Sequence, residues 1–477
     1  MRRLVPRGRP YSGHVATRAL ERTDASPRLR DLVDRQAAGA LVLAGAIPFL
    51  FLHERFQPEV TLTAGSTAVD IRTADLALLA VVAAALVAAV RLGVSRLSSA
   101  AILWASGASL LAWLAFETLR PASLDDARFD DHLVSFLKLV EYALLAVSVP
   151  LLVRRVRDLT LVLGAVVVWS AIATAVALLQ LGGLDVFAAS TAGWRYPSFL
   201  GRHDLAALSA LAASLAAAGI VVGRARRPAG RLFAFALGAG LLGLVLAGSV
   251  AAAGGFLVGA AGLWLVARVR FRPSRRQVLA LAALVAAVLL GVTAARSAAL
   301  EDFLRFVGLH GNESAQGVES YSQRTVLAYI GLRIFQDHPA LGAGWQRSAT
   351  PDVFEPYVPD ARARFPDVVD LAFPAEGREW GVQNLYIQML ADAGIVGLAL
   401  LLLVGAAGLV LAVRTAARAP AAWAAGAGLL VVCALLTLAG EWASLGIVPG
   451  IPLQAATCLL LGLAAAGVAA ASEEGDG

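Results

Sequence analysis

The stretch "GREWGVQNLYIQMLADAGIVGLALLLL", residues 377–403, runs from charged residues through the amides Gln383 and Asn384 straight into an apolar segment. The apolar segment continues to residue 413, so as a helix it is long enough to cross a hydrocarbon core about 30 Å thick. The Asn384 side chain can cap this helix by accepting hydrogen bonds from the free amides of its first turn. The stretch therefore predicts a membrane helix that begins at the edge of a polar loop.

The composition points the same way for the whole chain. The 477 residues are 58% hydrophobic and 16% charged, with a mean hydropathy of +0.72, which excludes an ordinary soluble protein. Open sheets leave edge amides without partners in lipid, and the long unalternating runs do not fit a barrel. We therefore predict an all-α, polytopic membrane protein of about twelve transmembrane helices with one long, partly helical exoplasmic loop.

Nine of these helices are expected within residues 37–295 and three within residues 384–471. The segment 232–267 is the least defined part, because only "AGS" separates its two apolar runs and they could form one bent element. The apolar runs lie near residues 37–52, 74–92, 99–117, 133–153, 159–181, 203–223, 232–247, 250–267, 277–295, 384–413, 421–440 and 451–471.

The placement of arginine sets the expected orientation. Five loops that would face the cytoplasm carry sixteen arginines, and the short loops of the other side carry six, as the positive-inside rule requires. Both termini are then cytoplasmic, as a basic disordered tail over residues 1–36 and a short tail over residues 472–477. Nine Arg against four acidic residues in the first tail favour anionic lipid headgroups over nucleic acid as its partner. The segment 296–383 is then expected outside the cell as an exoplasmic loop domain. The membrane that the helices cross is expected to be the plasma membrane.

Within this loop, "ESYSQRTVLAYIGLRIFQDHPALGAGW" predicts an amphipathic helix near residues 321–336. Ser320 and Gln323 fit a capping box, and Pro339 with the glycines after it ends the helix. Arg324 then lies near the positive end of the helix dipole, where a bound anion would stabilise it. The alternative is a surface arginine paired with Glu313 or Glu319.

A second polar loop, "TAGWRYPSFLGRHDLAAL" at residues 191–208, carries Arg195, Arg202 and His203 to the same face of the membrane. Arginine is scarce on that face, so two loops that each supply it suggest one shared anionic ligand. Lys138, the only lysine, lies inside a predicted membrane helix with Glu141 at i+3. It is a candidate for substrate binding, since ionisable residues within membranes often mark function, and a structural ion pair is the alternative. No metal-binding motif is present.

Three stretches together resemble the superfamily of O-antigen ligases and O-antigen polymerases, the glycosyltransferases of the bacterial envelope. They are "RYPSFLGRHDLAAL", "QRTVLAYIGLRIFQDHPALGAGW" and "VQNLYIQMLADAGIVGLALL", in this order. The resemblance implies glycan transfer without metal or cofactor at the outer face of the plasma membrane. The donor would be an oligosaccharide on undecaprenyl diphosphate, and the acceptor a sugar hydroxyl on a glycolipid or surface glycan. Lipopolysaccharide, capsule and cell wall all remain open as the acceptor.

The resemblance makes Arg195, Arg324 and Gln383 the catalytic candidates, with the two arginines holding the diphosphate. It makes Arg202, His203, Asn384 and Tyr386 candidates for substrate binding.

The chain departs from the family pattern at three positions. Gln383 replaces a histidine that would act as a base or align the acceptor, and an amide cannot take a proton near neutral pH. Val250 replaces the arginine that follows Ser249, and His203 replaces an asparagine. His310 and His338 are alternative bases.

Two other functions stay open at this point. A transporter or flippase for a lipid-linked anion could use the same arginines without breaking a bond. A catalytically degenerate relative could bind lipid-linked glycan and regulate a partner enzyme. The long outer loop disfavours the transporter, and the loss of the histidine favours the degenerate relative over it.

Overall fold

The computed structural model describes residues 38–64, 67–124, 126, 128–187, 195–222, 227–297, 320–378, 380–419, 422–447 and 451–473. The predicted tail at residues 1–36 lies outside these residues. So do most of the predicted tail at 472–477 and the part of the predicted loop from 298 to 319. The last helix continues to Glu473.

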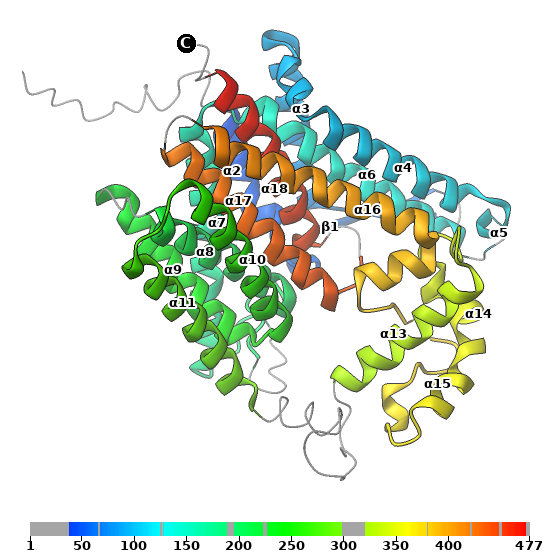
Figure 1. Ribbon diagram of the computed structural model, residues 1–477. Helices are drawn as coiled ribbons and strands as arrows, with labels where there is room; N and C mark the ends of the chain where they lie inside the picture. Colours follow the sequence, from blue (N-terminus) through cyan, green and yellow to red (C-terminus); the bar gives the residue numbers. More distant parts are fainter. Residues whose placement is uncertain are drawn as a thin grey trace, which may run out of the picture.

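Every apolar run predicted above corresponds to a helix, and the fold is that of an all-α polytopic membrane protein (Figure 1). Ten helices in the described part of the chain are long and apolar enough to cross a membrane, while α2 and the stretch 231–247 of α9 are shorter. The bounds are α2 Ala38–Leu50, α3 Thr73–Leu92, α4 Ala101–Leu119, α6 Phe129–Leu152, α7 Val156–Leu181, α8 Arg202–Val222, α9 Arg227–Ala247, α10 Val250–Arg270, α11 Arg275–Ala295, α16 Leu385–Arg418, α17 Ala422–Glu441 and α18 Pro452–Glu473.

The segment 232–267 forms two helices, not one bent element. Gly248 takes a φ of +57°, which ends α9, and Ser249 begins α10 by accepting a hydrogen bond from the Ala252 amide at 3.1 Å. A left-handed residue followed by a side-chain cap is a common way to separate consecutive helices. This short turn later proves to be one wall of the candidate site.

Helix α8 forms the centre of the bundle and is buried along nearly its whole length. It packs against α7, α9, α10, α17 and α18, and its sequence of Ala, Ser and Leu suits such close contact. Helices α10 and α17 approach closely for a related reason. A Cβ atom on Gly255 would lie 2.4 Å from the Thr437 carbonyl oxygen, so only glycine fits there.

The connection between α2 and α3 contains a β-hairpin that the sequence analysis did not predict. Strands β1 Glu59–Ala64 and β2 Thr67–Arg72 pair antiparallel, with Glu59 opposite Arg72. Arg72 forms ion pairs with Glu59 at 3.4 Å and with Glu54 at 2.6 Å. Short helical turns join other elements: η1 Glu54–Phe56, η2 Ser95–Ala100, α5 Pro121–Leu124 and η6 Trp442–Ser444.

Residues 320–378 form a small helical unit, here called the loop domain. Its first helix, α13, spans Ser320–Asp337, two residues longer than the prediction of 321–336. The amphipathic character predicted for this helix is confirmed, because Val326, Ile330 and Ile334 on one of its faces are buried in the core of the loop domain. The remaining elements are η3 Arg347–Ala349, α14 Pro351–Phe354, η4 Glu355–Tyr357, α15 Val358–Arg364 and η5 Asp370–Ala372.

The loop domain docks on α16 at a break in that helix, visible as the sharp bend where the two meet (Figure 1). The break is at Gly394, whose φ is +65°. Around it, the Ala343 amide donates to the Ala391 carbonyl at 2.7 Å and the Ile395 amide donates to the Pro339 carbonyl at 2.9 Å. The turn after α13 therefore satisfies backbone groups that the broken helix leaves open.

Gly394 has no room for a side chain, because a Cβ atom there would lie 2.1 Å from the Ala340 carbonyl oxygen. We expect Gly394→Ala to lower the melting temperature in detergent and to expose the loop domain to proteolysis. The left-handed backbone alone costs a non-glycine residue roughly 1–3 kcal/mol, before the clash is counted.

Gly405→Ala is the matched control, because Gly405 lies in the same helix and a Cβ atom there would meet no other atom within 4 Å. A Gly394→Ala variant that melts and resists protease like the Gly405→Ala variant would contradict this account of the docking.

Candidate functional site

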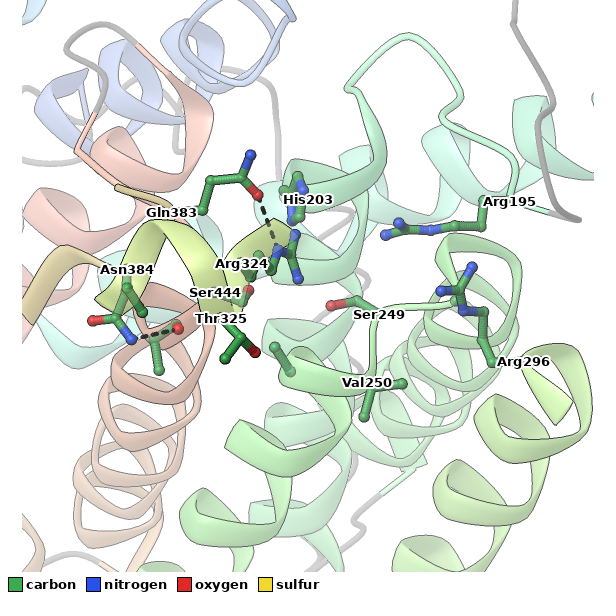
Figure 2. Close-up of a pocket in the computed structure, with 14 residues that line it drawn as sticks. Arg195, His203, Ser249, Val250, Arg296, Arg324, Thr325, Gln383, Asn384 and Ser444 are labelled. Carbon is green, nitrogen blue, oxygen red and sulfur yellow. Dashed lines mark hydrogen bonds between the residues drawn. The ribbon is translucent and has the colours of Figure 1, made fainter. Parts of the chain in front are cut away.

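A cavity of about 360 Å³ lies where α8, α10, α11, α13 and α16 come together. It is called the arginine cavity here, since its walls include Arg195, Arg296 and Arg324. Figure 2 shows Arg195 and Arg296 on one wall, and Arg324 with Gln383 and His203 on the facing wall. The two arginines predicted to share an anionic ligand therefore open into the same cavity.

Arg195 is held by the end of α9. Its Nε donates to the Ala247 carbonyl at 2.9 Å, and the next residue, Tyr196, donates its amide to the Leu246 carbonyl at 2.9 Å. The side chain is 9% exposed. Because Nε is used for this anchor, the terminal nitrogens of the guanidinium remain for the cavity, as Figure 2 shows.

Arg296 is a third arginine of the cavity, which the sequence analysis missed. It is the C-cap residue of α11 and its side chain crosses the turn at Gly248. A Cβ on Gly248 would lie 3.2 Å from Arg296 Cδ and 3.4 Å from Arg195 Cγ, so the absence of a side chain at Gly248 lets both arginines pass. No sequence pattern marks Arg296, because its place in the cavity depends on how α11 packs against α9 and α10.

Arg324 and Gln383 form the facing wall. Arg324 Nε donates to Gln383 Oε1 at 3.0 Å, and the hydrogen bond joins the first turns of α13 to the residue before the cap of α16. The resemblance described above led us to expect a histidine at this position, and here an amide accepts from the arginine instead. Glu313 and Glu319, the alternative partners of Arg324, lie outside the described residues.

The cations affect one another electrostatically. Burial lowers the pKa of the Arg195 guanidinium to about 10, and the positive charges of Arg296, Arg202 and Arg324 act in the same direction. Glu441 acts in the opposite direction. Repulsion among like charges in a partly buried space is relieved when an anion binds. The arrangement is therefore suited to a ligand with more than one negative charge.

A carboxylate lies behind this wall. Glu441, at the end of α17, is fully buried, and its Oε1 lies 3.6 Å from His203 Nδ1. The Ser249 hydroxyl lies 3.3 Å from the same oxygen as a hydrogen-bond donor. The sequence analysis did not single out Glu441, which follows directly after a predicted span. Its proximity to α8 and α10 arises only from the packing of the bundle.

The remaining candidates have structural partners. Asn384 lines the cavity and caps α16 as predicted, since its Oδ1 accepts from the Tyr386 and Ile387 amides at 3.0 and 3.1 Å. The Tyr386 hydroxyl donates to the Ala439 carbonyl at 2.7 Å, which ties α16 to α17. Neither Tyr386 nor Arg202 is among the described residues that line the cavity.

Lys138 lies away from the cavity. Its Nζ is 2.5 Å from Asp75 of α3 and 3.5 Å from Glu141, so the structure favours the alternative of a structural ion pair over substrate binding, and a second carboxylate joins the pair. His338, an alternative base, lines a different cavity together with Arg120 and Arg347, and His310 is outside the described residues. No group of three His, Cys, Asp or Glu that could hold a metal is found in the described part of the chain.

Residues 233–402 match the family described as O-antigen ligase. The matched region contains Arg296, Arg324 and Gln383 and ends before α17, and it begins after Arg195 and His203. No curated protein matches the chain.

The geometry of the arginine cavity predicts that it binds a free polyanion. We expect inorganic pyrophosphate to raise the melting temperature of the full chain, and Arg296→Ala to reduce that increase. Arg333→Ala should keep it, because Arg333 lies on the outer side of α13 in an exposed pair with Asp360. An equal increase of the melting temperature in the wild type, Arg296→Ala and Arg333→Ala would show that pyrophosphate binds outside this cavity.

The lowered pKa of Arg195 gives this binding a pH dependence with a definite sign. Below a pH of about 10 the Arg195 guanidinium is protonated and attracts the anion. As the pH rises through about 10, Arg195 loses its charge in the free protein, so the stabilisation by pyrophosphate should decline. A stabilisation that stays constant from pH ~8 to pH ~11 would contradict a role for Arg195, whose charge should change within that range.

Proposed function

Because the chain carries a domain of the O-antigen ligase family at residues 233–402, we propose that it is a membrane glycosyltransferase that acts on lipid-linked glycan. The donor is an oligosaccharide on undecaprenyl diphosphate and the acceptor is a sugar hydroxyl at the outer face of the plasma membrane. One observation carries the proposal: guanidinium groups from three separate segments, Arg195, Arg296 and Arg324, line one cavity.

The arginines match what the chemistry needs. When the bond between the sugar and the diphosphate breaks, negative charge develops on the diphosphate oxygens. Preplaced guanidinium groups stabilise that charge without reorganising during the reaction, and they bind phosphate oxygens in a fork geometry that lysine cannot reproduce. A cavity of about 360 Å³ accommodates a diphosphate and an adjoining sugar, and the lipid chain would leave it along the membrane.

The position of the cavity supports reaction at the membrane surface. Its lining residues lie at the first turns of α8, α10 and α16, at the end of α11 and on α13 of the loop domain. The distribution of arginine assigns the side of the loop domain to the outside of the cell. Donor and acceptor that are both anchored in the membrane would meet there with restricted orientation, which lowers the entropic barrier to transfer.

The alternatives differ from this proposal in what happens to the donor. A transporter would move the lipid-linked glycan intact, and a degenerate relative would hold it without transfer. Purified protein in lipid vesicles, given polyprenyl-diphosphate glycan and an acceptor glycan, should release free polyprenyl diphosphate if the chain is a transferase. Donor binding without release would favour the degenerate relative.

Arg324 gives the sharpest test of the diphosphate site. We expect Arg324→Ala to lower the rate of transfer by about 10²–10³-fold, the effect typical of removing a group that stabilises developing charge. Arg333→Ala is the matched control on the same helix and should retain the wild-type rate. A wild-type rate in Arg324→Ala would remove this residue from the site.

Gln383→His restores the residue that the family pattern expects. An imidazole can accept the Arg324 hydrogen bond through one nitrogen, so the arginine should remain in place. We therefore expect transfer at the wild-type rate or above, measured as initial velocity at saturating donor. A loss comparable to that of Arg324→Ala would mean that the amide itself is needed there.

A further inference from the structure

We propose that His203, oriented by Glu441, is the general base that takes the proton from the acceptor hydroxyl. The inference rests on the proposed function, since it assigns one step of that same transfer. The inference supplies a general base for the transfer, which Gln383 cannot be because its amide does not accept a proton.

Elimination among the residues of the arginine cavity gives the first support. Of the described residues that line it, the ionisable ones are Arg195, Arg296, Arg324 and His203. Arginine stays protonated and cannot act as a base at neutral pH. Histidine is the side-chain type among them that can take up and release a proton near neutral pH. A base that acts within this cavity is therefore His203, unless it comes from a residue outside the described part of the chain.

The contact with Glu441 gives the second support. The His203 side chain is 27% exposed and the Glu441 side chain is 1% exposed, and Nδ1 of the ring lies 3.6 Å from Oε1 of the carboxylate. Nδ1 is buried on the side of Glu441, while the residue itself lines the cavity. At 3.6 Å the contact is electrostatic and is not a hydrogen bond, and the carboxylate would stabilise the imidazolium that forms after proton transfer.

Glu441 has no other ion pair among the described residues. Its other described side-chain partner is the Ser249 hydroxyl, at 3.3 and 3.4 Å from the two carboxylate oxygens. Burying a carboxylate is costly unless a cation or donors compensate it. A proton taken up by His203 would supply that cation, so the buried position of Glu441 favours the protonated product of the step.

The positions of His203 and Gln383 add a third observation. The family pattern has an amide where this chain has His203, and an imidazole where it has Gln383. Both positions line the arginine cavity and flank Arg324 (Figure 2). At these two positions the imidazole and the amide have therefore exchanged places relative to the pattern that the resemblance implies.

The transfer step forms one bond, breaks one bond and moves one proton. The acceptor hydroxyl oxygen forms a bond to the anomeric carbon of the donor sugar, and the bond from that carbon to the diphosphate oxygen breaks. The electron pair of the broken bond stays on the diphosphate, beside the arginines. The hydroxyl proton goes to Nε2 of His203, which then releases it to water before the next turnover.

The test measures kcat against pH with the full-length protein in lipid vesicles. We expect His203→Asn to lower kcat by about 10²–10⁴-fold, with donor binding close to that of the wild type, and to abolish the acid limb of the pH profile. His338→Asn is the matched control, because His338 lies in a separate cavity. The charged groups that surround His203 and shape this profile are Glu441, Arg195, Arg202, Asp204, Arg296 and Arg324.

Glu441→Gln tests the orienting contact. This isosteric change keeps the hydrogen bond to Ser249 and removes the charge, so it should lower kcat less than His203→Asn and shift the acid limb to lower pH. The double variant His203→Asn, Gln383→His should recover part of the lost rate, because it returns an imidazole to the opposite wall. A residue with a merely structural role would give neither result.

The inference and the proposed function can fail separately. If the wild type releases polyprenyl diphosphate and His203→Asn does so at the same rate and with the same pH profile, the base is elsewhere and the transferase stands. His203→Gln gives a second measurement should the first variant misfold. If the wild type binds donor and releases nothing, the proposed function fails and this inference fails with it.

Discussion

The docking of the loop domain on the broken helix α16 is the constraint on which the candidate site depends. Hydrogen bonds between backbone groups near Pro339–Gly344 and Ala391–Ile395 hold the two parts together, and Gly394 allows the approach. Arg324 lies on the helix that leads into this turn, and Gln383 lies just before the helix that receives it. Their hydrogen bond at 3.0 Å therefore depends on the contact between the C-terminal end of α13 and the break in α16.

The opposite wall is fixed by another close approach. At the turn between α9 and α10, Gly248 leaves room for the side chains of Arg195 and Arg296 to pass. Buried cations of like sign repel one another, and the lowered pKa of Arg195 reflects this together with its burial. A fold that holds these cations in one place stores part of the free energy that an anionic ligand recovers on binding.

Sequence patterns predicted the parts of the structure that depend on local order. The positions of the twelve apolar runs, the extent of α13 and the cap at Asn384 follow from periodicity and spacing along one segment, whereas for Lys138 the ion pair with Glu141 was only the alternative to substrate binding. The β-hairpin was missed because it is short and amphipathic within a connection.

The site was predictable only in part. Arg195 could be named because arginine is scarce on the face predicted to be outside, and Arg324 because it lies near the start of a predicted helix, yet nothing in one sequence showed that they meet. Arg296 and Glu441 stand at the ends of apolar runs, where charged residues are ordinary, and their proximity to the cavity arises from contacts between helices far apart along the chain. The break at Gly394 was also hidden, since glycine inside a membrane helix more often serves close packing.

The burial of α8 has a consequence for how the protein is made. Asp204 in its first turn accepts a hydrogen bond from the Leu453 amide at 2.8 Å, and α17 and α18 cover other faces of the same helix. These partners are synthesised more than 200 residues later, so α8 must enter the bilayer before most of its surroundings exist. A nascent chain that stops short of α18 leaves a carboxylate without its amide, which gives membrane quality control a means to distinguish a truncated product from a finished one.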